Sequence, residues 1–344
     1  MKMVAYDPCG ANFLRMGRHD PAETRCHLWW SGSGIRMNID CTALEVEAES
    51  TAKDHAQWLG VMIDGAPVAR FVLMQGVHRY PVLAGMEAGV SHEVTILRDT
   101  QPSYDEDAPV ILHAVYTDGK PSAPEARPLR LEFIGDSLTV GEGCVGPESA
   151  DEWRMAWISH MPTFATLVSE KLHAEKQVVA LGGWGASRSW DNDVNSRIGR
   201  IYDQLSAVTP GGDVPYAEPD APVDAVVINL GTNDGSGLAK IPEAERAEAE
   251  EALVRDAAGL LRQVRARHPK AYILWAYGMC GHAVEPMLQK AVELRKQEGD
   301  GRVAYYHLSE AKSLGSRLHP SREAHRVTAG EIAEALEEAL RLKK

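Results

Sequence analysis

Four short segments of the chain combine glycine with side chains that are suited to acyl transfer. FIGDSLTVGEG contains Ser137, VVALGGWGAS contains Gly185, VVINLGTNDG contains Asn233, and LGSRLHPSREAH contains His319. A serine hydroxyl is a weak nucleophile unless a base takes its proton, and His319 is the candidate base. The backbone N–H groups of Ser137 and Gly185 and the side-chain amide of Asn233 can converge on an oxyanion. We expect glycine at position 185 because it leaves room for substrate.

Each segment alone also fits an ordinary turn or loop, so their joint position in the fold decides the interpretation. After residue 127, apolar strand-like runs alternate with stretches of helical spacing, which predicts a doubly wound α/β fold with a parallel sheet. In such a sheet, ligands bind beyond the carboxyl ends of the strands, and all four segments fall at that edge. The predicted strands are 129–135, 177–181, 224–230, 271–276 and 303–307, and the predicted helices are 162–176, 243–268 and 321–340.

The first third of the chain has a different pattern. Short apolar runs separated by turn residues predict a β-sandwich, and Asp64-Gly65 between two of them predicts a type I′ hairpin. The proline-rich stretch 118–128 then predicts a linker, which divides the chain into domains 1–126 and 127–344. The predicted strands of the first domain are 26–30, 35–39, 44–48, 58–63, 69–74, 92–97 and 110–116.

Composition excludes several classes of protein. The 344 residues carry a net charge of −13, which argues against nucleic acid or an anionic membrane as the main partner. No stretch approaches the roughly 18 apolar residues of a membrane helix, and the first residues lack the apolar run of a signal peptide. We therefore expect a cytoplasmic protein. Five widely spaced cysteines predict reduced thiols and no zinc ribbon or disulfide scaffold.

The four segments together resemble the SGNH (GDSL) hydrolase superfamily, which is named for Ser, Gly, Asn and His in four sequence blocks. A small β-sandwich that leads through a proline-rich linker into this domain, and the run RLEFIGDSLTVGEG, are similar to carbohydrate esterase family 2. The resemblance implies a flavodoxin-like three-layer α/β/α domain preceded by a jelly-roll sandwich. It also implies removal of acetyl groups from polysaccharides such as xylan and glucomannan, without a metal or other cofactor.

One position departs from the superfamily pattern. The usual last block is Asp-x-x-His, but Ser316 stands three residues before His319. Family 2 esterases use a Ser-His dyad whose histidine is held by a backbone carbonyl, so we predict a carbonyl within 316–318 as the acceptor. Glu310 and Glu323 are the alternatives if a remote carboxylate holds the ring instead.

Other residues of the site region have two interpretations each. We interpret Asp136 and Asp234 as hydrogen-bond acceptors that stabilise turns. Aromatic side chains can stack on sugar rings or simply pack in the protein, which leaves both roles open for Trp184, Trp153 and Trp275. Trp157 fits a buried helical face with Trp153, and Trp29-Trp30 fits the core of the sandwich. The histidines at 160, 268, 282, 307 and 325 show no metal-like spacing, so we interpret them as structural.

These observations predict a carbohydrate O-acetyl esterase acting on acetylated xylo- or manno-oligosaccharides. The alternatives are a lipase, lysophospholipase or thioesterase of the GDSL type, or a carbohydrate-binding protein with an inactive site. The sequence leaves open the sugar, the hydroxyl that is deacetylated and the oligomeric state.

Overall fold

The computed structural model describes residues 2–102, 109–207, 214–217 and 222–341, which form two compact units. The first unit comprises Met1–Arg127, Arg154–Met161 and Gln204–Ala217, and the second comprises Pro128–Trp153, Pro162–Asp203 and Glu218–Lys344. The division after Arg127 lies beside the predicted boundary at 126/127. The two later segments that pack with the first unit carry no signal in the sequence that would assign them to it.

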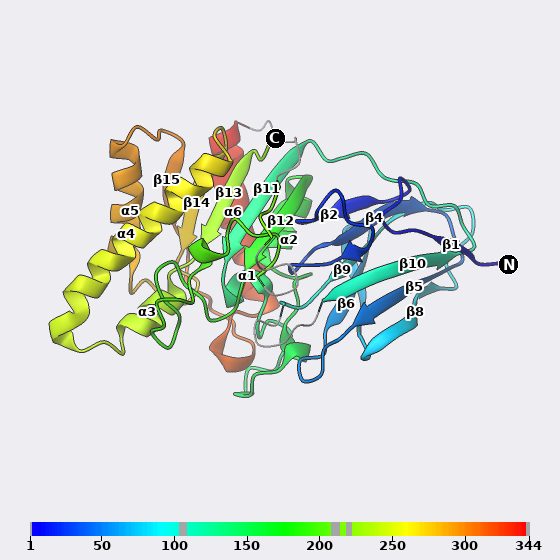
Figure 1. Cartoon of the computed structure of the whole chain (residues 1–344), viewed down its shortest axis with the longest axis horizontal. Coiled ribbons are helices and arrows are strands. Elements are labelled where there is room, and N and C mark those ends of the chain that lie inside the picture. Colours follow the sequence, from blue (N-terminus) through cyan, green and yellow to red (C-terminus); the bar gives the residue numbers. More distant parts are fainter. Residues whose placement is uncertain (1, 103–108, 208–213, 218–221, 342–344) are drawn as a thin grey trace. The chain divides into compact units, whose positions relative to one another are not determined.

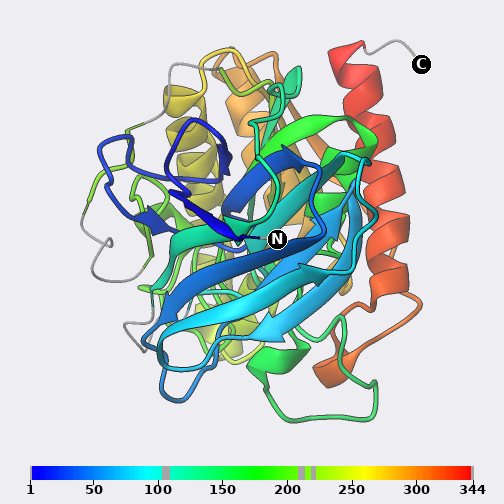
Figure 2. The same ribbon diagram turned by 90° about the vertical axis from the view of Figure 1, so that its right-hand side faces the viewer.

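The first unit is a jelly-roll sandwich of two antiparallel sheets, as predicted (Figure 2). From β4 to β10 each connection crosses to the other sheet, except the hairpin between β6 and β7. One sheet has the order β1 (Val4–Tyr6), β10 (Val110–Thr117), β5 (Ala43–Ser50) and β8 (Gly76–Ala84), with β3 (Cys26–His27) also paired to β10. The other has the order β2 (Leu14–Met16), β4 (Gly34–Ile39), β9 (His92–Arg98), β6 (Trp58–Ile63) and β7 (Ala66–Val72).

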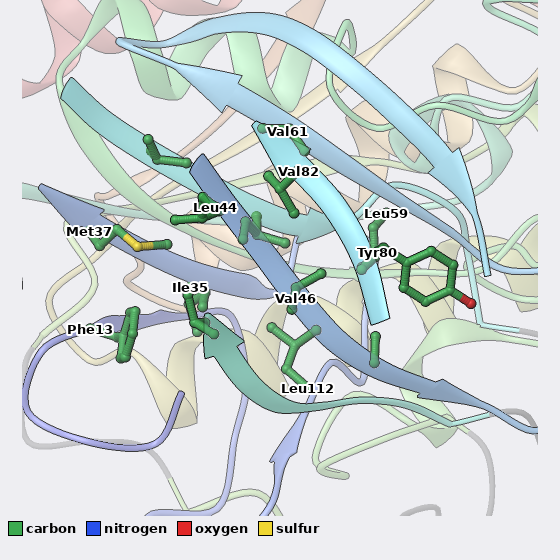
Figure 3. Close-up of a cluster of buried hydrophobic side chains, with 14 of the residues drawn as sticks. Phe13, Ile35, Met37, Leu44, Val46, Leu59, Val61, Tyr80, Val82 and Leu112 are labelled. Carbon is green, nitrogen blue, oxygen red and sulfur yellow. The ribbon is translucent and has the colours of Figure 1, made fainter. Parts of the chain in front are cut away.

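The core of this unit lies between the two sheets. Alternate residues of β5 are buried, as expected for a strand with one face on the core. Figure 3 shows Leu44 and Val46 from this strand among Ile35, Leu59 and Leu112 from other strands. Burial of this apolar cluster is the main favourable contribution to the folding of the unit.

Local turn chemistry confirms one strand pair and explains why one strand was missed. Asp64 and Gly65 connect β6 to β7 with φ of 50° and 78°, the positive values that a type I′ turn requires. Strand β8 was not predicted, because Pro81 interrupts its apolar pattern. Proline is tolerated there because β8 is an edge strand and its pairing with β5 shifts register beside Pro81.

The second unit is the predicted three-layer α/β/α domain. Its parallel sheet has the flavodoxin-like order β12 (Ala174–Ala180), β11 (Leu129–Gly135), β13 (Ala225–Asn229), β14 (Tyr272–Tyr277) and β15 (Val303–His307). Helix α4 (Glu243–Arg267) packs beside α5 (Glu285–Gln297) on one face, and α2 (Phe164–Lys171) beside α6 (Arg322–Leu340) on the other (Figure 1). Right-handed crossovers produce this division of the helices.

Short elements at the strand ends were not predicted. Helices α1 (Ser137–Val140) and α3 (Thr232–Leu238) begin just after β11 and β13, and short 3₁₀ turns occur at Met155–Trp157, Ile198–Arg200 and Ser316–Leu318. The prediction of a helix through residue 176 was wrong, because His173 adopts a φ of 50° and Ala174 begins β12. Among the residues that the structure describes, no helix is both long and apolar enough to cross a bilayer.

Candidate active site

Ser137 lies at the point where a buried strand turns directly into a helix. Asp136 caps helix α1 by accepting a hydrogen bond from the Leu138 N–H at 3.0 Å, so its predicted turn-stabilising contact is confirmed. A Cβ at Gly135 would lie 1.9 Å from the hydroxyl oxygen of Thr139, so only glycine permits this turn. The strand and helix therefore fix the position of the Ser137 hydroxyl.

His319 is oriented by a backbone carbonyl. Its Nδ1 lies 3.0 Å from the carbonyl oxygen of Arg317, and its Nε2 lies 3.1 Å from the Ser137 hydroxyl oxygen. Because a carbonyl only accepts, Nδ1 carries the hydrogen and Nε2 accepts from the Ser137 hydroxyl. The acceptor falls within the predicted segment 316–318, whereas Glu310 contacts His282 and Glu323 contacts Arg326.

The loop that supplies this carbonyl is strained. Arg317 and Leu318 adopt φ of 56° and 59°, a left-handed conformation that costs a non-glycine residue about 1–2 kcal/mol. Arg317 is held by its N–H, which donates to the Ala150 carbonyl at 2.8 Å, and by an ion pair with Glu142 at 2.5 Å. These contacts keep the Arg317 carbonyl in place beside His319 Nδ1.

Glu142 and Gly143 complete the contact between this loop and the nucleophile's helix. The buried Glu142 carboxylate also lies 3.8 Å from His319 Nε2. Gly143 has a φ of 72°, and a Cβ there would meet the Ser316 carbonyl oxygen at 2.4 Å and His319 Cβ at 2.8 Å. Sequence reasoning did not identify either residue; their only signal was a place in the run that follows Ser137.

Asn233 lies beside the nucleophile's turn as the second residue of α3. Its side-chain amide donates one hydrogen bond to the Trp184 carbonyl at 2.8 Å and one to the Asp136 carboxylate at 3.1 Å. An oxyanion is a stronger acceptor than a neutral carbonyl, so it can displace the Trp184 oxygen. The amide is therefore held in position by groups from the turn after β11 and from the loop after β12.

The loop that contains Gly185 is organised by Asp234. The fully buried Asp234 carboxylate accepts hydrogen bonds from the N–H groups of Ala186, Ser187 and Arg188 at 2.7–3.1 Å, which confirms its predicted turn-stabilising contact. The expected reason for glycine at 185 was wrong, because a Cβ there would lie 2.1 Å from the Arg188 carbonyl oxygen and 2.5 Å from the Asp234 carboxylate. The protein itself, not a substrate, takes up that space. The Gly185 N–H makes a long hydrogen bond of 3.4 Å to the Ser196 carbonyl.

Burial changes the ionisation of the groups around the dyad. Burial, with the nearby charges of Asp234 and Glu142, raises the pKa of Asp136 to about 8, although the Leu138 N–H opposes the shift. Burial also raises the pKa of Asp234, against the three backbone N–H groups that favour its ionised form. Burial, together with the charge of His319, lowers the pKa of His325 to about 3. His325 is therefore neutral at neutral pH.

The tryptophans fall into different environments. Trp275 is fully buried in β14 and donates to the Leu230 carbonyl at 3.0 Å, so its predicted contact with substrate was wrong. Trp29 and Trp30 are buried in the first unit, in agreement with the predicted core role. Trp184 and Trp153 are half-buried, so a contact with sugar stays a prediction for both.

Trp190 was missed by sequence reasoning although it is the most exposed tryptophan among the described residues, at 53%. Its backbone N–H donates to the Gly183 carbonyl, which places it on the same loop as Gly185. The Lys240 ammonium lies 4.2 Å from its ring centroid. Its only sequence signal was its place five residues after Gly185 in that glycine-rich segment.

Comparison with known proteins identifies the family. Residues 133–327 match the model of the GDSL-like Lipase/Acylhydrolase family, which covers more than half of the chain, and the chain belongs to that family. Residues 15–121 match the model of the carbohydrate esterase 2 N-terminal domain. Both resemblances noted in the sequence are thereby confirmed.

Individual relatives are distant in sequence. The chain is 24% identical over 332 residues to the cellulase/esterase CelE of Acetivibrio thermocellus, covering 93% of this chain but 38% of CelE. It is 23% identical over 309 residues to an acetylxylan esterase / glucomannan deacetylase of Cellvibrio japonicus, covering 89% of this chain and 83% of that protein. The chain thus spans less than half the length of CelE.

Solved structures share the whole fold. The acetyl xylan esterase Est2A from Butyrivibrio proteoclasticus matches with a TM-score of 0.95 at 24% identity, covering 99% of this chain and 100% of that one. A family two carbohydrate esterase from Clostridium thermocellum, in complex with cellohexaose, matches with a TM-score of 0.85 at 22% identity. The match covers 96% of this chain and 99% of that one. At these identities the likeness establishes the fold.

Proposed function

We propose that the chain is a carbohydrate O-acetyl esterase that removes acetyl groups from xylo- or manno-oligosaccharides through an acetyl-serine intermediate. The observation that carries this proposal is the chain of contacts from the Arg317 carbonyl through the His319 ring to the Ser137 hydroxyl. The carbohydrate substrate is supported by relatives named acetylxylan esterase / glucomannan deacetylase and by the family two esterase solved with cellohexaose.

In the proposed reaction, the Ser137 oxygen attacks the ester carbonyl while His319 Nε2 takes the hydroxyl proton. Collapse of the tetrahedral intermediate breaks the bond to the sugar oxygen, and His319 returns its proton to that oxygen. Water then attacks the acetyl-serine by the same route, which releases acetate and regenerates Ser137. The Arg317 carbonyl supplies orientation but no negative charge, so we assign stabilisation of the charged ring to Glu142, 3.8 Å from Nε2.

We assign the oxyanion hole to the N–H groups of Ser137 and Gly185 and to the Asn233 amide. The 3.4 Å bond from the Gly185 N–H to Ser196 is long, so redirecting this donor to an oxyanion gives up little. Asn233 exchanges the Trp184 carbonyl for the oxyanion while Asp136 keeps the other amide hydrogen in place. Trp184 and the exposed Trp190 are the candidate platforms for sugar rings.

Rates on esters of different chain length test this function against a GDSL lipase or thioesterase. We expect acetyl esters to be cleaved much faster than octanoyl esters, and acetylated xylo- or manno-oligosaccharides to lose acetate when followed by NMR. Faster cleavage of octanoyl esters would favour the lipase. A covalent serine probe that fails to label Ser137 would favour an inactive binding protein. The cytoplasmic location stays a prediction.

A further inference from the structure

Two histidines and a glutamate converge at the carboxyl end of β14 and β15. His282 lies in the loop between β14 and α5, Glu285 is the first residue of α5, and His307 is the last residue of β15. One ligand atom from each lies within 4.8 Å of the others. The three residues come from three different elements, so their spacing in the sequence gave no sign of a metal site.

The tautomer of His282 is fixed by the backbone. Its Nε2 lies 2.9 Å from the carbonyl oxygen of Leu308, which can only accept, so Nε2 carries the hydrogen. The neutral ring then has its lone pair on Nδ1, and Nδ1 lies 3.3 Å from the carboxylate oxygen of Glu310. A neutral His282 therefore presents Nδ1, with the Glu310 carboxylate beside it, to a cation. A backbone carbonyl that accepts from the second nitrogen is the usual support of a metal-binding histidine.

Glycine makes this support possible. Gly278 has a φ of 143°, and a Cβ there would lie 2.3 Å from the Leu308 carbonyl oxygen and 2.4 Å from His282 Nε2. Any other residue at position 278 would therefore separate the ring from the carbonyl that orients it. The orientation of His282 is thus built into the backbone of the loop and does not depend on a flexible side chain.

His307 and Glu285 form the other half of the cluster. His307 Nδ1 lies 2.8 Å from a Glu285 carboxylate oxygen, and the rings of His307 and His282 stack at 4.0 Å. To place both rings on one ion, His307 must turn out of the stack. Its side chain is 59% exposed, so it has room to turn. The side chains of His282 and Glu285 are about one-fifth exposed, so an ion can reach them from solvent.

We propose that His282, Glu285 and His307 bind a divalent transition-metal ion of the zinc class, with Glu310 as a fourth ligand. Imidazole nitrogens with carboxylate oxygens are a donor set that suits Zn²⁺. A divalent ion would balance the negative charge of the two carboxylates. The ion would join the loop after β14 to α5 and to the end of β15, and it takes no part in the Ser137–His319 chemistry.

Calorimetric titration with Zn²⁺ tests this site. The protein should carry no histidine tag, be stripped with a chelator, and be titrated in a buffer that binds metal weakly. We expect one ion per chain, and a loss of affinity of about tenfold or more in both His307→Ala and Glu285→Gln. Ester hydrolysis by both variants should equal that of the wild type, which shows that they are folded.

His113→Ala is the matched control. His113 Nε2 lies 2.8 Å from a Glu49 carboxylate oxygen in the first unit, so the substitution removes a histidine–carboxylate contact outside the cluster. The Zn²⁺ affinity of the His113→Ala variant should equal that of the wild type. Absence of a stoichiometric Zn²⁺ site in the wild type, or an equal loss in His113→Ala and His307→Ala, would overturn the proposal.

Discussion

Gly143 provides a direct test of how the loop before His319 is held against the nucleophile's helix. Gly143→Ala would place a Cβ 2.4 Å from the Ser316 carbonyl oxygen and 2.8 Å from His319 Cβ, whereas ordinary contacts begin near 3.4 Å. The carbonyl must therefore retreat by about 1 Å and His319 by about 0.6 Å. A misplacement of about 1 Å in a catalytic group can cost about 10²-fold in rate, so we expect kcat/KM on an acetyl ester to fall by about that factor.

The positive φ of 72° at Gly143 adds a backbone strain that must be separated from this displacement. Gly299→Ala is the matched control, because Gly299 has a φ of 95° with no atom within 4 Å of a Cβ. Both variants should lose about 1–2 kcal/mol of unfolding free energy in urea, but only Gly143→Ala should lose activity. Activity of Gly143→Ala within threefold of Gly299→Ala would refute the reasoning.

Three further substitutions test separate parts of the site. Asn233→Ala should lower kcat on an acetyl ester by about 10²–10³-fold with little change in KM, and an effect on KM alone would make Asn233 a substrate-binding residue. Ser316→Ala should cost less than about tenfold, because Ser316 meets Gly143 and His319 through its backbone; a loss near the 10⁴-fold of a triad carboxylate would contradict a carbonyl-held histidine. Asp136→Asn should flatten the dependence of stability on pH. The folded-state pKa of about 8 lies above the ordinary 3.8, so the Asp136 contribution is complete below pH 4 and is lost as pH rises through 8. Urea unfolding between pH 5 and 7 should show a slope reduced by up to about 1.4 kcal/mol per pH unit, and an unchanged slope would show that Asp136 is not protonated in the fold.

Most of the architecture could be predicted from the sequence, because the spacing of apolar residues indicates which residues are buried. Short apolar runs and the Asp64-Gly65 turn predicted the sandwich, and the apolar run 129–135 predicted β11. Strand β8 was hidden because its edge position tolerates Pro81 and polar residues. The end of α2 was misplaced because the conformation of His173, not a change in composition, ends the helix.

The residues of the site could be predicted only in part, for a different reason. Ser137, Asn233 and His319 each follow recognisable glycine-rich or loop sequences, but the contact of Glu142 with Arg317 joins residues 175 positions apart. Trp275 looked like a strand-end aromatic in the sequence, and only the three-dimensional packing shows that it is covered on all sides. Long-range packing of this kind leaves no periodic signal in one chain.

The central claim is that Ser137 forms the acetyl-enzyme during deacetylation of an oligosaccharide. Acetate release from acetylated xylo- and manno-oligosaccharides, followed by proton NMR with the wild type and Ser137→Ala, tests it most directly. We predict acetate release by the wild type and a loss of about 10³-fold or more in a folded Ser137→Ala variant. Equal acetate release by the two proteins would contradict the account.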